Sequence, residues 1–212
     1  MSKIFSFILK HITEIMVVFL MIYAITPFIS PLLFSFNSDS VIAKNIQNIY
    51  TFFCHQRPQS SLFLFGGEES QYFYNLDELK VLGVVPEDSL VSTGAGYWGN
   101  EEIGYKVAFC IRDIGIYLSL ALVGLFLVIF INIKRKIVRV HCLVILLLML
   151  PMVFDGIFQF IVMYFDIASV PEVYLLSMHK KLITGALFGI GAALFVFPNL
   201  KDASGLGYNE KE

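Results

Sequence analysis

Four short groups of polar residues in this sequence carry side chains that can do chemistry. They span residues 54–58, 110–117, 155–159 and 177–185, and each lies beside or inside a strongly apolar stretch. They supply thiols, imidazoles, carboxylates and cationic groups, the side chains that bind metal ions, transfer protons or exchange disulfides. Polar side chains are costly next to hydrocarbon, so we expect each of the four clusters to have a functional or a structural role.

The first two groups contain Cys54 and Cys110, for which three chemistries stay open. They can form a structural disulfide, since thiols outside the cytoplasm tend to be oxidised. They can ligate zinc, copper or iron together with His55, with a carboxylate or His179 as the fourth ligand. They can also be a redox-active dithiol that exchanges with a quinone or a partner protein. Because no Cys-x-x-Cys or His-x-x-x-His motif decides among these, all three are kept, and Cys142 is expected to be a packing residue.

The other two groups place polar side chains on predicted helices. Asp155 and Gln159 are one helical turn apart and therefore share a face. Asp155 can hold helices together by pairing with Lys181 or Arg112, and Gln159 can do so by bonding to Thr184. Alternatively, Asp155 is a proton carrier, a general base or a cation ligand. The ligand or ion-binding candidates are then Asp155, Gln159, Lys181 and Thr184. The catalytic candidates are Cys54, His55, Cys110, Arg112, Asp155 and Gln159.

The composition shows which kind of protein must position these residues. The chain has 212 residues, of which 57% are hydrophobic and only 15% are charged. Soluble domains carry roughly 25% charged residues, so the charge that coats a water-facing surface is missing. A net charge of −2 gives no attraction to nucleic acid. The composition therefore indicates an integral membrane protein and excludes a nucleic-acid partner, leaving membrane lipid as the expected one.

Four segments are long and apolar enough to cross a bilayer, which takes about 20 residues of helix. They run over residues 15–36, 114–133, 140–165 and 182–200. We therefore predict an all-α, multi-pass protein with one membrane domain over residues 1–212. Most lysines and arginines near the span ends fall on one side, which predicts cytoplasmic N and C termini in the plasma membrane.

The predicted outer loop covers residues 37–109. Ile42, Ile46, Ile49 and Phe53 recur in it at helical spacing, which predicts an amphipathic helix at the membrane interface or packed on the bundle. Residues 66–104 are acidic and rich in glycine and tyrosine, and we expect a small insertion of turns and a hairpin there.

All four polar groups are predicted to converge on the outer half of the bundle. At about 1.5 Å per helical residue, Asp155 lies about 15 Å from the outer end of its span, and Gln159 lies one turn nearer. Arg112 and Cys110 stand at the outer end of the second span, and Thr184 is close to the outer end of the fourth.

The order of these motifs also resembles a known family. Cys-His-Gln-x-Pro occurs at residues 54–58, Cys-x-Arg-x-x-Gly-x-Tyr at 110–117, Asp-Gly-x-x-Gln at 155–159 and Thr-Gly at 184–185. Together they resemble a family of small bacterial and archaeal polytopic membrane proteins of unknown function. The resemblance implies an architecture and a set of positions, and it implies no activity or cofactor.

Three functions remain as hypotheses. The protein is a membrane-embedded redox or metal-dependent protein built on the cysteines, a small transporter or ion carrier that uses Asp155, or a structural or partner subunit of a membrane complex. No motif commits it to being an enzyme. Gly185 and Gly189 form a small-residue face that is expected to pack against a partner helix or a second copy.

Overall fold

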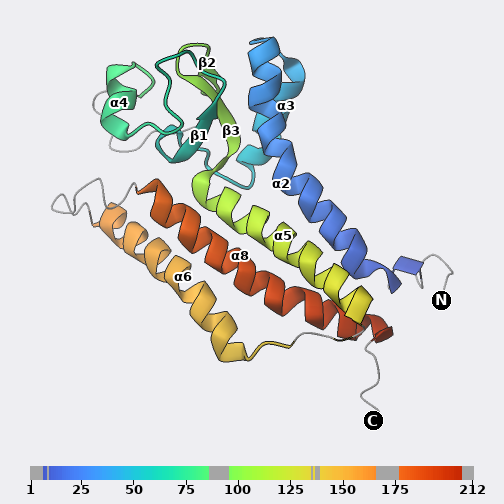
Figure 1. Ribbon diagram of the computed structural model, residues 1–212. Coiled ribbons are helices and arrows are strands. Elements are labelled where there is room, and N and C mark those ends of the chain that lie inside the picture. The colour runs from blue at the N-terminus through green and yellow to red at the C-terminus, as the bar shows by residue number, and fades with distance from the viewer. Residues whose placement is uncertain are drawn as a thin grey trace. The chain divides into compact units, whose positions relative to one another are not determined.

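A computed structural model describes residues 7–8, 10–85, 96–134, 136, 139–165 and 177–206. Within them, four helical segments are long and apolar enough to cross a membrane (Figure 1). They are α2 (Ile12–Phe36), α5 (Ile111–Lys134), the stretch Cys142–Ile161 of α6 (Cys142–Tyr164), and Met178–Ser204, which contains α8 (Met178–Lys201). The prediction of four spans in a mainly helical protein is confirmed.

The chain divides into two compact units. Unit 1 comprises Met1–Ala24, Gly115–Phe158 and Ile183–Glu212, and unit 2 comprises Ile25–Ile114 and Gln159–Leu182. Each long helix contributes residues to both units, because the boundaries fall within the helices.

Unit 1 has a core shared by three helices. Val17, Leu20 and Ala24 of α2 pack with residues of α5 and α8, among them Ala121 and Phe197. Between α8 and α5 the backbones approach closely at Gly189, where an added Cβ would collide with Ile116 and Ser119. Lipid gives helices no hydrophobic drive to associate, so close contacts of this kind hold membrane helices together.

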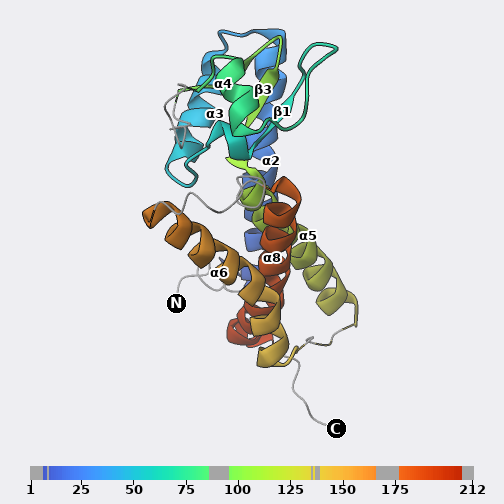
Figure 2. The ribbon, with the colours of Figure 1, turned by 90° about the vertical axis from the view of Figure 1, so that its left-hand side faces the viewer.

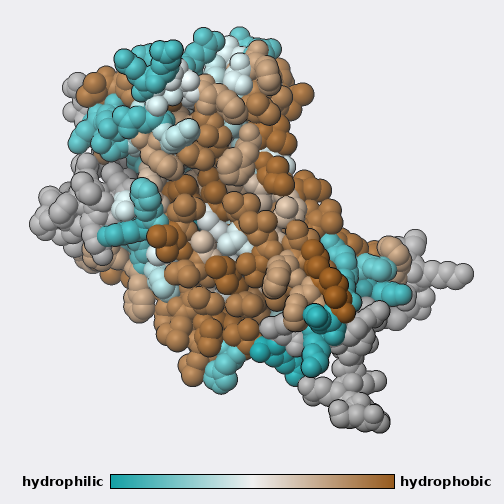
Figure 3. All heavy atoms as spheres, viewed as in Figure 1, coloured by the Kyte–Doolittle hydropathy of each residue, from teal (hydrophilic) through white to brown (hydrophobic). Residues whose placement is uncertain are grey.

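Helix α6 runs alongside α8 in both ribbon views (Figure 2) and meets it near Gly191, where Met149 is in contact range. It is otherwise mostly exposed, as its membrane-length stretch is only 6% buried. On the face shown in Figure 3, hydrophobic residues cover the long helices of unit 1. Hydrophilic residues gather near the ends of α5 and α8, which suits helices whose sides meet lipid.

Unit 2 contains an antiparallel sheet in the order β1–β3–β2. The strands are β1 (Ser61–Leu64), β2 (Gly99–Asn100) and β3 (Gly104–Cys110). The hairpin expected within residues 66–104 is present as β2–β3, but β3 continues to Cys110 and the sheet is larger than predicted. The first six residues of β3 are all buried. A strand buried on both faces lacks the alternation of apolar and polar residues that marks a half-buried strand, so periodicity does not reveal it.

The amphipathic helix is confirmed as α3 (Val41–Thr51), capped by the Ser40 side chain. Its buried side chains are Ala43, Gln47 and Tyr50. Most of its predicted apolar face stays exposed, with Ile42 at 65% and Ile49 at 57%. Of the two settings predicted for this face, its exposure fits contact with lipid at the membrane interface better than packing on the described protein.

The rest of unit 2 packs around the sheet. A short helix, α4 (Leu76–Val81), begins at a capping box in which Asn75 and Glu78 bond reciprocally. Its residues Leu76 and Leu79 pack with Phe63 of β1. The prediction for this segment was turns and a hairpin, without a helix. The 310 turn η1 (Pro58–Ser60) leads directly into β1.

Candidate functional site

The loop that follows α3 holds the first cysteine motif in a strained conformation. Gln56 has a φ of 47°, in the left-handed region that favours glycine. Its side-chain Nε2 donates to the Gln47 carbonyl at 2.8 Å, and its own carbonyl accepts from Lys106 Nζ at 2.8 Å. These two buried hydrogen bonds hold the loop in place. Backbone strain such as that at Gln56, maintained by surrounding contacts, is typical of functional sites.

The second cysteine stands where strand β3 ends and helix α5 begins. The Cys110 backbone N–H donates to Cys54 Sγ at 3.3 Å. Cys110 Sγ donates to Asp113 Oδ2 at 3.1 Å, since Asp113 lies in the first turn of α5. One ligand atom from each of Cys54, Cys110 and Asp113 lies within 4.8 Å of the others. The two thiols and the carboxylate therefore meet at one point.

Both cysteines are free thiols, so the structural disulfide considered in the sequence analysis is not formed in the structure. Cys142 is also free and is exposed on α6. Among the described residues, the side chains that could hold a metal ion together are Cys54, Cys110 and Asp113, and a carboxylate was one of the further ligands predicted. His55 lies on the wall of the neighbouring pocket and is exposed, while Asp113 takes its place in the cluster.

The cluster opens onto a pocket of about 310 Å³ that lies entirely within unit 2. Its lining comes from the α3–η1 loop, the β3–α5 junction, α6 and α8. The lining residues are Phe53, Cys54, His55, Gln56, Arg57, Ser60, Cys110, Arg112, Asp113, Gln159 and Lys181.

Six of the predicted site residues thus line one pocket. They are Cys54, His55, Cys110, Arg112, Gln159 and Lys181. Asp155 and Thr184 belong to unit 1 and are not among the lining residues. The role of Asp155 therefore stays a prediction.

Lys181 is the most deeply buried cation of this pocket. Only 7% of its surface is exposed, and Nζ donates to Ser60 Oγ at 2.9 Å. From the sequence, this lysine was either a helix contact that pairs with Asp155 or a ligand-binding side chain; the neighbouring Lys180 is exposed. Burial of an ammonium group is costly unless the surroundings compensate it. Its position in the pocket wall makes Lys181 part of the site.

Sequence reasoning missed Lys106, which lies in the middle of β3 and is fully buried. Burial lowers its pKa to about 7, and the nearby Cys54 acts in the opposite direction. The pKa of the Cys110 thiol is raised well above its usual value, first by its hydrogen bond with Cys54 and then by burial and the Asp113 charge. One feature of the sequence could have indicated that Lys106 is buried: it is the single charged residue in the otherwise apolar stretch 105–109.

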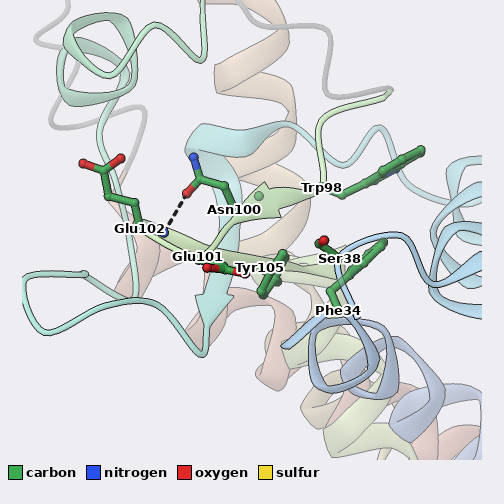
Figure 4. A pocket seen from close by; sticks show the side chains of 8 residues that line it. Phe34, Ser38, Trp98, Asn100, Glu101, Glu102 and Tyr105 are labelled. Atoms are coloured by element: carbon green, nitrogen blue, oxygen red, sulfur yellow. Dashed lines mark hydrogen bonds between the residues drawn. The ribbon is translucent and has the colours of Figure 1, made fainter. Parts of the chain in front are cut away.

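A second hollow, of about 450 Å³, lies elsewhere in unit 2. The ring of Phe34 stacks on Trp98 at 5.9 Å and on Tyr105 at 5.6 Å between centroids. In Figure 4 the side chains of Asn100 and Glu102 point away from these rings. Asn100 Oδ1 accepts from the Glu102 backbone at 3.1 Å, so its role is to shape the hairpin. Besides these three rings, the lining residues include Ser38, Glu101 and Glu102, and none of the predicted site residues lines this hollow.

Comparison with known proteins agrees with the membrane assignment. The model of a family described as "Predicted membrane protein (DUF2085)" matches residues 103–195. That stretch includes Cys110, Arg112 and Lys181, and it ends at the C-terminal part of α8. No curated protein and no solved structure matches the chain. The chain is a multi-pass membrane protein.

Proposed function

We propose that this chain is a membrane-bound metalloprotein whose metal ligands are Cys54, Cys110 and Asp113. One observation carries the proposal: their ligand atoms lie within 4.8 Å of one another at the wall of a pocket. Cys54 follows α3, whereas Cys110 and Asp113 stand at the β3–α5 junction, so the fold brings together residues that are distant in sequence.

The donor set favours a borderline-soft divalent ion such as zinc. Thiolates select zinc, copper(I) or iron over magnesium and calcium, and a carboxylate completes many zinc sites. Three protein ligands leave one tetrahedral position for water or substrate, as in catalytic rather than structural zinc sites. His55 on the pocket wall is a candidate proton acceptor beside that position.

We further propose that the site faces the outside of the plasma membrane, with both chain termini in the cytoplasm. The support is the placement of lysine and arginine: Lys134 is the last residue of α5, and Arg135 and Lys136 come next in the sequence. A membrane-impermeant thiol reagent applied to intact cells tests this. Labelling of Cys142 without cell disruption would contradict the orientation.

The metal proposal is tested by elemental analysis of the protein purified in reducing buffer and loaded with zinc. We expect about one zinc ion per chain in the wild type, because three side chains converge on one point. Cys54→Ser and Cys110→Ser should lose most of it, and Asp113→Asn should bind more weakly. Cys142→Ser is the matched control and should keep the wild-type stoichiometry.

The same samples distinguish the redox alternative, which the proximity of the two thiols also favours. Mass-tagged alkylation before and after reduction counts the free thiols. Stoichiometric metal that disappears with Cys54→Ser supports the metal centre. If the wild type binds no metal and instead forms a Cys54–Cys110 disulfide on mild oxidation, the metal proposal is wrong and the redox dithiol replaces it.

A further inference from the structure

The pocket beside the thiols carries an excess of positive charge. Among its described lining residues, Arg57, Arg112 and Lys181 are cationic, and Asp113 is the single carboxylate. That carboxylate already accepts a hydrogen bond from the Cys110 thiol. The lining is therefore suited to an anionic molecule.

The three cations come from different parts of the fold. Arg57 precedes η1, Arg112 lies in the first turn of α5 and Lys181 in the first turns of α8. A solvated surface patch would leave all of them extended into water, but Lys181 is only 7% exposed and Arg57 and Arg112 are partly buried. Cations held at a partly dry cavity bind anions more strongly than the same charges in water.

The chemistry of the donors narrows the class of anion. Guanidinium groups present a planar fork of N–H donors that matches phosphate and carboxylate oxygens, and an ammonium adds a point charge. Ser60 and Gln159 supply neutral polar groups to the same wall. At about 310 Å³ the pocket is near the lower end of the range of ligand sites, roughly 300–1,000 Å³. This suits a phosphate group or a small headgroup.

The rim adds an apolar surface. Phe53 lines the pocket and is 62% exposed, and it lies in the turn that follows α3, four residues after the exposed Ile49. Phe52, beside it, is 87% exposed. A molecule with an anionic head and an apolar tail fits a cationic pocket with this rim.

We propose that this pocket binds a phosphate-group oxyanion, carried by an anionic lipid headgroup or present as free phosphate. This inference rests on the proposed function, because the pocket adjoins the proposed metal site and the inference names the class of ligand that binds there. The apolar rim favours the lipid as the source.

The test uses the full chain in nanodiscs, with two probes. Inorganic phosphate is titrated into protein in phosphatidylcholine discs, and phosphatidic acid retention is measured in mixed discs by native mass spectrometry. Removing one charged donor should weaken binding about tenfold, so Lys181→Gln and Arg112→Gln are the test variants. Lys180→Gln is the matched control, because Lys180 is the exposed neighbour on the same helix.

Lipid retention that falls in Lys181→Gln but not in Lys180→Gln supports the headgroup as the source. The same pattern with inorganic phosphate alone supports free phosphate. Equal losses in both lysine variants, or no binding of either probe by the wild type, overturn the inference. Size-exclusion chromatography checks folding, and Arg57→Gln in the loop replaces any variant that does not fold.

Metal content is measured on every one of these variants. Arg112 and Lys181 are not metal ligands, so their substitution should leave zinc stoichiometry unchanged. Zinc retained without phosphate binding defeats this inference alone, whereas phosphate binding without zinc defeats the proposed function alone.

Discussion

Lys201 in unit 1 and Lys181 in unit 2 are both buried, and their surroundings differ. In unit 1, Lys201 is 4% exposed, and its Nζ donates to Glu14 Oε1 at 3.1 Å and to Asn132 Oδ1 at 3.2 Å. In unit 2, Lys181 donates to the Ser60 hydroxyl and shares a pocket with two arginines. The first lysine is paired with a carboxylate across a helix interface, whereas the second lies in the wall of a cavity.

The comparison separates polar residues that assemble a bundle from those that can bind something. Asn132 Nδ2 also donates to Glu14 Oε1 at 3.2 Å, so α2, α5 and α8 all contribute to one polar contact. Within that contact the Lys201 ammonium and the Glu14 carboxylate neutralise each other. A paired charge of this kind contributes mainly to packing geometry. The pocket in unit 2 instead gathers three cationic side chains beside two thiols, and we therefore place the proposed function there.

The largest expected effect comes from breaking the pair in unit 1. Glu14→Gln leaves the buried Lys201 ammonium without its carboxylate. A broken buried pair costs about 3–5 kcal/mol, and we expect about 2–3 here because the Glu14 side chain is 32% exposed. The measurement is denaturant unfolding in detergent micelles, and zinc binding at unit 2 should not change.

The control for this prediction is the double variant Glu14→Gln with Lys201→Met. Removing both charges should restore most of the lost stability, since no unpaired ammonium remains buried. A double variant as unstable as Glu14→Gln would show that the ion pair is not what the substitution broke.

The next effect tests close helix packing in unit 1. A Cβ at Gly189 would collide with the Ile116 carbonyl and the Ser119 side chain, so Gly189→Ala should destabilise the chain by about 1–3 kcal/mol. Gly156→Ala on α6 is the matched control, because a Cβ there meets nothing within 4 Å. Thermal unfolding compares the two, and the control should be neutral or slightly more stable.

This pair of variants also bears on the partner helix predicted from Gly185 and Gly189. Gly189 is buried against α5 within the same chain. If Gly189→Ala lowers stability without changing the oligomeric state on size-exclusion chromatography, the small-residue face serves this bundle. A loss of oligomer at unchanged stability would instead support the predicted partner.

Much of the fold could be predicted from the sequence, because the signals are local. A run of about 20 apolar residues indicates a span wherever it occurs, and Ser40 followed by periodic isoleucines indicates α3. The β1–β3 pairing, which sets Phe63 against Lys106, could not be predicted. It joins distant segments, and the buried β3 has no alternation to reveal it.

The site was predictable as a set of residue types but not as a geometry. The sequence indicated that Cys54 and Cys110 matter and offered His55, with a carboxylate or His179, as further ligands, but it gave no geometry, and His55 is exposed in the structure. Asp113 joins the cluster because α5 begins directly after β3 and places its first turn beside Cys110. The position of this junction depends on how β3 pairs with β1, and that pairing could not be predicted from the sequence.

The smallest expected effect concerns Lys106 in unit 2 and depends on pH. Unfolded Lys106 holds its proton up to a pKa of about 10.4, whereas in the folded protein burial lowers this pKa to about 7. Between these values the unfolded state binds more protons, so this lysine makes stability rise with pH; below pH 7 its burial cost is present in full. Lys106→Met removes that cost and also removes the hydrogen bond to the Gln56 carbonyl.

We therefore expect Lys106→Met to raise stability by about 1–2 kcal/mol at pH 6 in the metal-free protein, with the gain shrinking toward pH 10. Lys80→Met on α4 is the control, because Lys80 is a lysine of the same unit that is only half-buried. Unfolding of both variants and the wild type across this pH range measures the difference. A gain that is the same at pH 6 and pH 10 would mean that Lys106 stays charged in the folded protein, and that its environment compensates the charge as fully as Glu14 compensates Lys201.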